Sequence, residues 1–311
     1  MIIRALRTPA PTAAALCTML IALAGSPVCA QQAGMAGMPD MPGMTHASAP
    51  VSPKARAEIA DVARAVNSFS TTSAAAAAGF RPVFGWIPTM GVHWIDRASM
   101  MDAAPPNLLK PDNLMFSRIA GRDSLVGAAY AYFGAAGDST RPTLFDGAPA
   151  WHEHPDLAPP GETLTMLHVW FVPSPDGPFA GTNPNLPFWA AGLDAPDASR
   201  MRDPAFSSRV RRASLALAEV VDTTSILPQL ERRPQVRAAM AALRDSVRAL
   251  MPGLLKAQQE RDAAGWDRVA DQLAAQWDAM DAVYVGAAHT TDGRARIQRF
   301  IAMLLGQHHA D

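Results

Sequence analysis

Histidine side chains, the commonest protein ligands for zinc, copper and iron, are concentrated in the middle of this 311-residue chain. Four of the eight histidines lie there: His93, His152, His154 and His168. His152 and His154 flank Glu153, and alternate side chains of an extended segment point the same way, so this pair can face one ion. The four histidines therefore favour a shared metal site, completed by Glu153, Glu162 or Asp96.

The same histidines also have purely structural interpretations. His93 precedes Trp94, and His168 lies two residues before Trp170. A histidine beside a tryptophan in a strand is commonly a hydrogen-bonded core residue, and the segment 152–154 can be a solvated loop. At the level of sequence both interpretations stay open.

A second candidate metal-binding segment lies nearer the N-terminus. Methionine recurs at every third position there and is followed by a histidine: Met35, Met38, Met41, Met44 and His46. Thioethers are soft ligands that favour Cu(I), and the intervening glycines and prolines prevent a stable helix. We therefore expect residues 31–53 to be a disordered tail that captures or hands over Cu(I). The alternative is a flexible linker in which methionine is incidental.

Two classes of function follow from these residues. The first is a metal-binding protein, for which copper is favoured by the methionine tail and zinc or iron is possible. The second is a metal-dependent hydrolase, lyase or oxidoreductase, in which the histidines leave one coordination position open. Glu153 or Glu162 would then be a general base, and Trp86, Trp94 and Trp170 would line an apolar pocket for a small organic substrate. A closed four-ligand site indicates storage, and a three-ligand site in a cleft indicates catalysis.

Several other function classes are excluded or unsupported. The 27 Lys and Arg residues nearly balance the 28 Asp and Glu residues, which gives no reason to expect a nucleic-acid partner. Both cysteines, Cys17 and Cys29, lie in the first thirty residues. The remaining chain therefore has no disulfide, catalytic thiolate or iron–sulfur cluster. It also has no nucleophile elbow, phosphate-binding loop or dinucleotide fingerprint.

The first thirty residues are typical of a secretory signal peptide. Arg4 and Arg7 precede an uncharged apolar run from residue 13 to 24, and Val28-Cys29-Ala30 fits a small-residue cleavage site. The run is shorter than the about 20 residues that cross a bilayer. A lipoprotein anchor at Cys29 is the less favoured alternative. We expect export to the periplasm or the medium, with no membrane span in the mature chain.

The rest of the chain is expected to be α+β. In residues 54–196, apolar periodicity predicts a helix over 54–78, and short apolar runs predict a mainly antiparallel sheet with strands near 80–87, 92–95, 113–119, 124–133 and 164–172. Residues 197–311 form a helical region with stripes at 206–221, 236–254, 266–284 and 297–305. These stripes can form a bundle or bury their apolar faces in a homo-oligomer, with Trp277 and Tyr284 as candidate interface anchors.

Several short landmarks recur in a fixed order along residues 55–190. They are Ala76-Ala77-Ala78-Gly79-Phe80, Met90-Gly91-Val92-His93-Trp94, Leu125-Val126-Gly127-Ala128-Ala129-Tyr130, Leu167-His168-Val169-Trp170, Asp176-Gly177-Pro178-Phe179 and Asn183-Pro184-Asn185. In these the chain resembles an uncharacterised family of exported bacterial α+β proteins. The resemblance implies a compact α+β domain and self-association, implies no settled activity, and singles out His93 and His168.

Overall fold

The structure is a computed structural model that describes residues 51–102, 105–138, 140–147, 151–154, 157–221 and 226–306. The expected signal peptide and the tail residues Met35, Met38, Met41, Met44 and His46 lie outside the described residues. The α+β region and the helical region expected from the sequence belong to one compact unit. No helix in the described ranges is long and apolar enough to cross a membrane.

A six-stranded antiparallel sheet forms the centre of this unit, which confirms the expected α+β class. Its strands, in spatial order, are β1 (Arg81–Ile87), β2 (Gly91–Ile95), β3 (Asn113–Ile119), β4 (Arg122–Ala135), β6 (Glu162–Trp170) and β5 (His152–His154). Each of the five predicted strands is present, and β5 adds a short edge strand beside β6. Strand β5 pairs with β6, the next strand along the chain, and this brings the two histidines on β5 next to His168.

The segment expected as one helix from residue 54 to 78 is divided into three short helices. They are α2 (Pro53–Ala65), the 3-10 helix η1 (Asn67–Phe69) and α3 (Thr72–Ala77). Thr71 accepts a hydrogen bond from the Ala74 amide at 3.2 Å and so caps the start of α3. The prediction of a continuous helix is wrong because the serines and threonines of residues 70–73 bond to the local backbone and begin a new helix.

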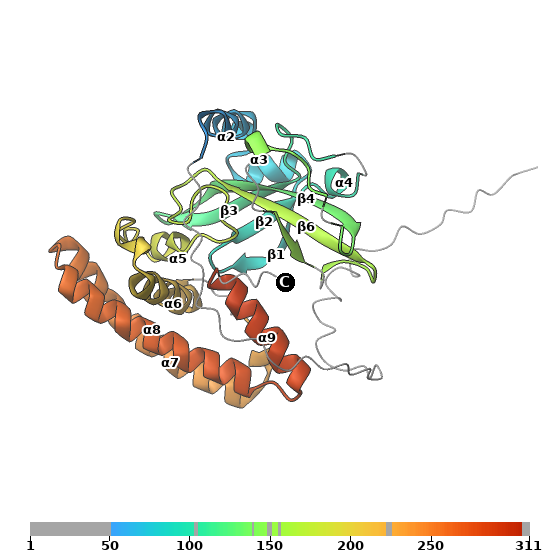
Figure 1. The fold of residues 1–311 in the computed structure, drawn as a ribbon. Coiled ribbons are helices and arrows are strands. Elements are labelled where there is room, and N and C mark those ends of the chain that lie inside the picture. Colours follow the sequence, from blue (N-terminus) through green and yellow to red (C-terminus); the bar gives the residue numbers. More distant parts are fainter. Residues whose placement is uncertain are drawn as a thin grey trace, which may run out of the picture. The chain divides into compact units, whose positions relative to one another are not determined.

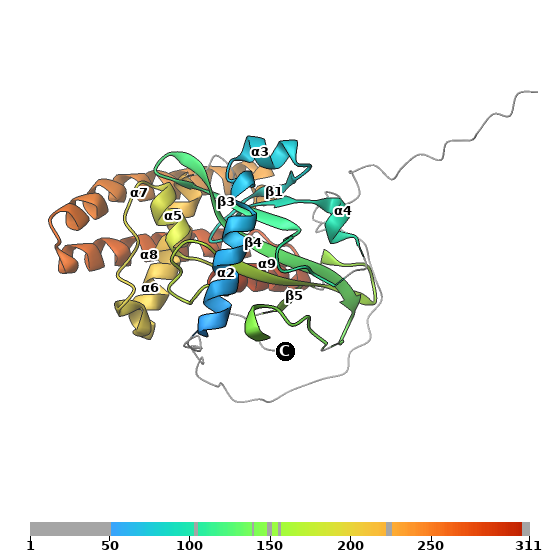
Figure 2. The ribbon, with the colours of Figure 1, turned by 90° about the horizontal axis from the view of Figure 1, so that it is seen from above.

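Helices cover both faces of the sheet. One face, called the α2 face, packs on α2 and α3 through Leu114, Phe116, Ala128, Tyr130, Leu167 and Val169. The other face, called the α5 face, packs on the short helix α5 (Asn185–Ala190) through Met115, Ala129, Met166 and Trp170. Figure 1 shows α2 and α3 on one side of the sheet and α5, α6 and α9 on the other, and Figure 2 shows α2 lying across the strands.

The four helices expected after residue 197 are confirmed. They are α6 (Pro204–Val221), α7 (Pro234–Gln259), α8 (Ala263–Gly286) and α9 (Thr291–Leu304). Helix α8 packs along both α6 and α7, and their apolar faces form a core of their own beside the sheet. Trp277 and Tyr284 are buried in that core. These two aromatic residues are therefore engaged within their own chain, and the homo-oligomer stays a prediction.

A buried ionic network ties three of these helices together. Glu219 on α6 has no exposed side-chain surface and is bound by Arg244 of α7, which also binds Glu231. The hydroxyl of Tyr284 on α8 donates to Glu219 at 2.6 Å. Burial raises the pKa of the Glu219 carboxyl, while Arg244 and these hydrogen bonds lower it. The positive charge of Arg244 therefore offsets much of the free-energy cost of burying the Glu219 carboxylate.

Removal of this arginine should destabilise the helical region strongly. In Arg244→Met the Glu219 carboxylate loses its cation in a dry site, and the free energy of unfolding should fall by about 3–5 kcal/mol. Arg248→Met is the matched control on the same helix, because Arg248 is exposed and, within the described ranges, its ion pair is with the exposed Asp245. Urea denaturation of the control should change by less than about 0.5 kcal/mol. Equal losses in the two variants would contradict the assignment.

Candidate metal centre

The four histidines singled out in the sequence lie on the α5 face of the sheet. His93 is in β2 directly opposite Met115, and His168 is in β6 directly opposite Ala129. His152 and His154 of β5 lie opposite Met166 and Leu164. Since directly opposite residues in an antiparallel pair point to one face, all four imidazoles share the face of Met115 and Ala129.

The imidazole rings form a connected cluster. Nε2 of His93 lies 3.4 Å from Nε2 of His168. Ring centroids are 5.4 Å apart for His93 and His168, 5.0 Å for His152 and His168, and 4.9 Å for His152 and His154. The structure thus brings the isolated histidines and the pair close together, although 75 residues separate His93 from His168.

Small residues on β4 allow the two central rings to meet. Strands β3 and β4 lie between β2 and β6, so the backbones of His93 and His168 are three strand spacings apart, about 14 Å in a flat sheet. On the α5 face β4 carries Gly127, Ala129 and Ala131 between them. A Cβ at Gly127 would lie 2.5 Å from the Met115 methyl carbon and 2.5 Å from the Val169 carbonyl oxygen. Strand β4 therefore carries only small residues on this face, and the Met115 side chain of β3 fills the space beside Gly127.

The orientation of His168 is set by a backbone carbonyl. Its Nδ1 lies 2.7 Å from the carbonyl oxygen of Gly181, and a carbonyl can only accept, so Nδ1 carries the proton. Nε2 is then the unprotonated nitrogen and presents its lone pair to His93. Trp170, two residues along the same strand, donates its indole N–H to the neighbouring carbonyl of Ala180 at 2.6 Å.

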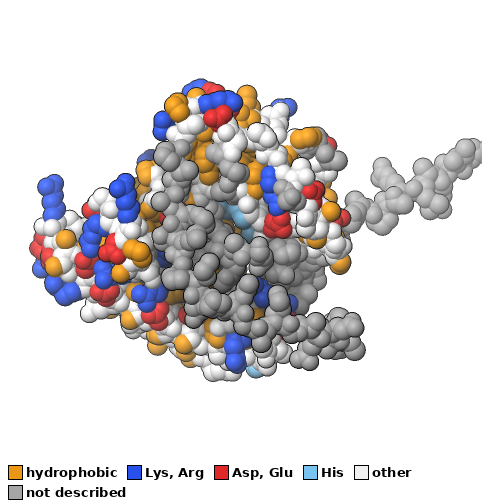
Figure 3. Space-filling model, viewed as in Figure 1, with side chains coloured by type: hydrophobic (Ala, Val, Ile, Leu, Met, Phe, Trp, Pro, Cys, Tyr) orange, Lys and Arg blue, Asp and Glu red, His pale blue; other side chains and the backbone are white. Residues whose placement is uncertain are grey.

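Burial keeps the central pair of imidazoles uncharged. His93 and His168 are 5% and 1% exposed. Burial, and then the charge of His154, lowers the pKa of His93 to about 4. Burial likewise lowers the pKa of His168, with His152 and His93 as further causes. At neutral pH both rings are neutral, which is the form that binds a metal ion. Figure 3 shows a small area of histidine surface near the middle of the face drawn there.

The acidic side chains expected to complete the metal site make contacts elsewhere or are exposed to solvent. Glu153 alternates with His152 and His154 on β5, so it points to the α2 face, where it pairs with Arg141. Glu162 is exposed at the first position of β6. Asp96 caps the short helix α4 (Arg97–Met100) through the Ala98 amide. These contacts give no support to a general base or a carboxylate ligand at the cluster.

Asp112 is a buried carboxyl that the sequence did not single out. Its oxygens accept from the Asn113 side-chain amide at 2.6 Å and from the Ala131 amide at 3.1 Å. Burial raises the pKa of Asp112 to about 7, against the lowering effect of these bonds, and Asp96 adds a smaller repulsion. In the sequence Asp112 lies between Pro111 and the start of β3, as an ordinary loop aspartate could. Only the tertiary structure shows that its carboxyl is buried.

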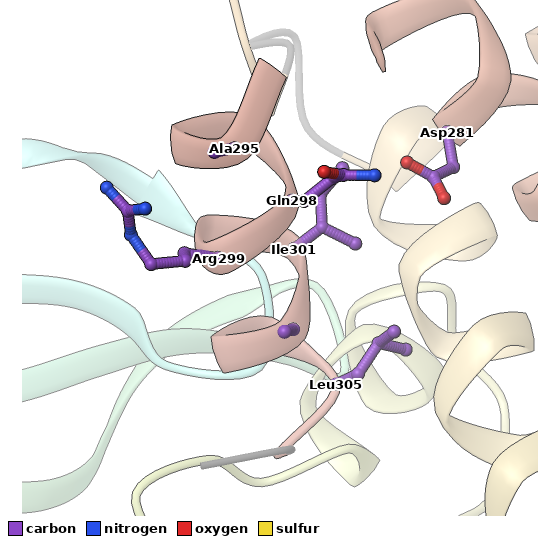
Figure 4. Close-up of a pocket in the computed structure, with 7 residues that line it drawn as sticks. Asp281, Ala295, Gln298, Arg299, Ile301 and Leu305 are labelled. Atoms are coloured by element: carbon purple, nitrogen blue, oxygen red, sulfur yellow. The ribbon is translucent and has the colours of Figure 1, made fainter. Parts of the chain in front are cut away.

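Two surface pockets lie outside the histidine cluster. The larger, about 440 Å³, is lined by residues of α8, α9 and the end of α9, and Figure 4 shows Asp281 and Gln298 facing one another across it while Arg299 points away. The smaller, about 240 Å³, is lined in part by Trp86 and Trp94. Trp170 is not among its lining residues, because it lies with His168 on the α5 face. The single pocket expected for the three tryptophans is therefore not formed.

As they stand, no three His, Cys, Asp or Glu side chains in the described ranges are arranged to hold a metal ion. His93 and His168 make a close pair, and the rings of His152 and His154 lie beside this pair without completing a set of ligands. Comparison of the chain with protein-family models, with curated proteins and with solved structures finds no match. The resemblance stated for residues 55–190 therefore stays a prediction.

A methyl group at Gly127 should disturb the face that carries the histidines. Gly127→Ala forces the Met115 side chain or the Val169 backbone to shift, and overpacking of this kind costs about 1–3 kcal/mol. Gly134→Ala on the same strand is the control, since its Cβ would meet only a Tyr132 ring atom at 3.5 Å. Urea unfolding should show the loss in the first variant and no loss in the second.

Asp112 should give the protein a pH dependence opposite to that of its buried histidines. Its folded-state pKa of about 7 exceeds the usual value, so the folded state keeps a proton that the unfolded state releases. Between pH 4 and 7 this group alone therefore lowers the free energy of unfolding by about 1.4 kcal/mol for each unit of rising pH. Measured at pH 5 and pH 7, the unfolding free energy should fall in the parent relative to Asp112→Asn. Parallel profiles would contradict this.

Proposed function

We propose that this protein is an exported metal-binding protein in which His93, His152, His154 and His168 hold one transition-metal ion, with copper favoured. The observation that carries the proposal is the 3.4 Å separation of the Nε2 atoms of His93 and His168. Two nitrogen ligands at about 2.0–2.1 Å from a tetrahedral ion lie about 3.4 Å apart. The pair therefore already has the spacing of two ligands on one ion.

The spacing of the other rings supports the same interpretation. Imidazoles bound to one tetrahedral ion have ring centroids about 5 Å apart, because each ring extends outward from its ligand nitrogen. The three neighbouring pairs in the cluster have centroid distances of 4.9, 5.0 and 5.4 Å. The competing interpretation is a hydrogen bond between two neutral histidines. That bond would run from the Nε2–H of His93 to the lone pair on Nε2 of His168. Among the described residues the buried Nδ1 of His93 has no hydrogen-bond partner under either interpretation, so the ring spacing is what favours the metal.

Methionines beside the cluster support copper. Met115 lies opposite His93 in the sheet, and Met166 lies opposite His152, so two buried thioethers share the face of the imidazoles. Cu(I) binds both soft thioether ligands and imidazoles, whereas zinc binds thioethers less favourably. The methionine tail, which lies outside the described residues, would add capture of Cu(I) from its surroundings. Zinc and iron remain the alternatives for the histidine site.

Binding is favoured over catalysis by the setting of the cluster. His93 and His168 are buried, and neither of the two pockets described above is lined by a histidine. The general-base candidates Glu153 and Glu162 are turned to other surroundings. A metal-dependent enzyme would need an open coordination position beside space for a substrate.

Metal analysis tests the proposal. The chain from Gln31, purified without an affinity tag, reconstituted with Cu(I) or Zn(II) and desalted, should retain about one ion in the histidine site. The double variant His93→Ala, His168→Ala should lose it. His289→Ala should retain it, because His289 is exposed near the start of α9. Circular dichroism confirms that each variant is folded before its metal content is compared.

A tail variant separates the two candidate binding segments. Replacement of Met35, Met38, Met41 and Met44 by leucine should leave the retained ion in place and slow its loading from a Cu(I) donor. If the parent stays empty after reconstitution with copper, zinc and iron, the proposed function is wrong. If the tail variant alone is empty, the ion belongs to the tail and not to the histidines.

A further inference from the structure

One loop links the candidate metal centre to the C-terminal helices. Residues 173–183 follow β6 and return to its side, and the Gly181 carbonyl at the end of this loop accepts from His168 at 2.7 Å. Within the loop, the Pro178 carbonyl also accepts from the Trp170 backbone amide at 2.8 Å. The loop is therefore the element that fixes which nitrogen of His168 faces His93.

Arg211 of α6 holds this loop from outside the sheet. Its Nη2 donates to both carboxylate oxygens of Asp176 at 2.6 Å, and its Nη1 donates to the Leu305 carbonyl at 3.2 Å. The guanidinium is largely buried, at 16% side-chain exposure. A planar guanidinium can make all these bonds at once, which a lysine cannot. Arg211 therefore joins the loop, α6 and the end of α9.

A strained turn belongs to the same junction. Thr89, between β1 and β2, has a φ of 62° and is 1% exposed. Its carbonyl accepts from the Asn183 amide at 2.7 Å, and its hydroxyl donates to the Leu304 carbonyl at 3.2 Å. A β-branched residue in the left-handed region costs free energy and persists only where its surroundings demand it. The turn before His93, the loop after His168 and the end of α9 therefore meet at one place.

We propose that Arg211 is a positioning residue for the metal site, acting through the 173–183 loop on the tautomer of His168. This inference rests on the proposed function. With the loop held, the Gly181 carbonyl keeps the proton on Nδ1 and leaves Nε2 of His168 free to bind the ion. With the loop released, the proton moves between the two nitrogens and the ligand is lost for part of the time. Groups that orient a metal-binding histidine typically contribute 10–100-fold to metal affinity.

The test compares arginines on one helix. Arg211→Gln and Asp176→Asn should each weaken metal binding 10–100-fold in competition with a chromophoric chelator. The double variant should bind metal no more weakly than either single variant, because each substitution removes the same contact between Arg211 and Asp176. Arg209→Gln is the matched control, since Arg209 lies two residues away on α6 and pairs with Asp267 and Asp271 of α8 instead. It should bind as the parent does.

A second measurement does not depend on metal. Nitrogen NMR of the metal-free protein should show a single Nδ1-protonated tautomer for His168 in the parent and in Arg209→Gln. Arg211→Gln and Asp176→Asn should show a mixture, which a general loss of stability would not produce in a folded protein. Should Arg211→Gln fail to fold, Asp176→Asn answers the question, because Asp176 is partly exposed.

The outcomes separate this inference from the proposed function. Parent-like affinity and an unchanged His168 tautomer in the folded variants would overturn the role of Arg211, whatever the parent binds. A parent that binds no metal would overturn the proposed function. The tautomer measurement would then still decide whether Arg211 positions His168.

Discussion

The hydrogen bond from His168 Nδ1 to the Gly181 carbonyl is the contact on which the arrangement of the histidines depends. A buried neutral imidazole has one donor and one acceptor nitrogen, and each needs a partner. Once the carbonyl takes the donor, the acceptor nitrogen must face something that supplies positive charge. In this sheet it faces Nε2 of His93, where a proton or a metal ion can lie between the two rings. Burial of both rings and the lowered pKa of His93 make a second proton there costly.

Both the sheet and the helical region contribute to this contact. The sheet brings His93 and His168 over a strand whose residues on that face, Gly127 and Ala129, leave room for the rings. The helical region holds the loop that carries Gly181, through Arg211 and the end of α9. This explains why the two regions, which look separate in the sequence, form one compact unit in the structure.

The short landmarks of the resemblance gain a physical meaning from the fold. Met90–Trp94 holds the turn and strand of His93, and Leu125–Tyr130 is the strand with small residues beneath the rings. Leu167–Trp170 carries His168, Asp176–Phe179 binds Arg211, and Asn183–Asn185 joins the loop to Thr89. Segments separated along the chain therefore surround one site.

The sequence alone determined the elements and the residue types. Short apolar runs located the five main strands, and apolar periodicity located the four long C-terminal helices, because burial of one helix face imposes a regular spacing along the sequence. Residue type alone also singled out His93, His152, His154 and His168. Only the tertiary structure decided that His93 meets His168, that Glu153 points to the opposite face and that Asp112 is buried. The roles of Gly181 and Arg211 likewise come from contacts between distant segments, a backbone carbonyl and an ion pair, which leave no periodic trace in a sequence. Strand order, the sheet face on which a side chain lies and the path of a loop are properties of the whole chain, which is why local pattern could not supply them.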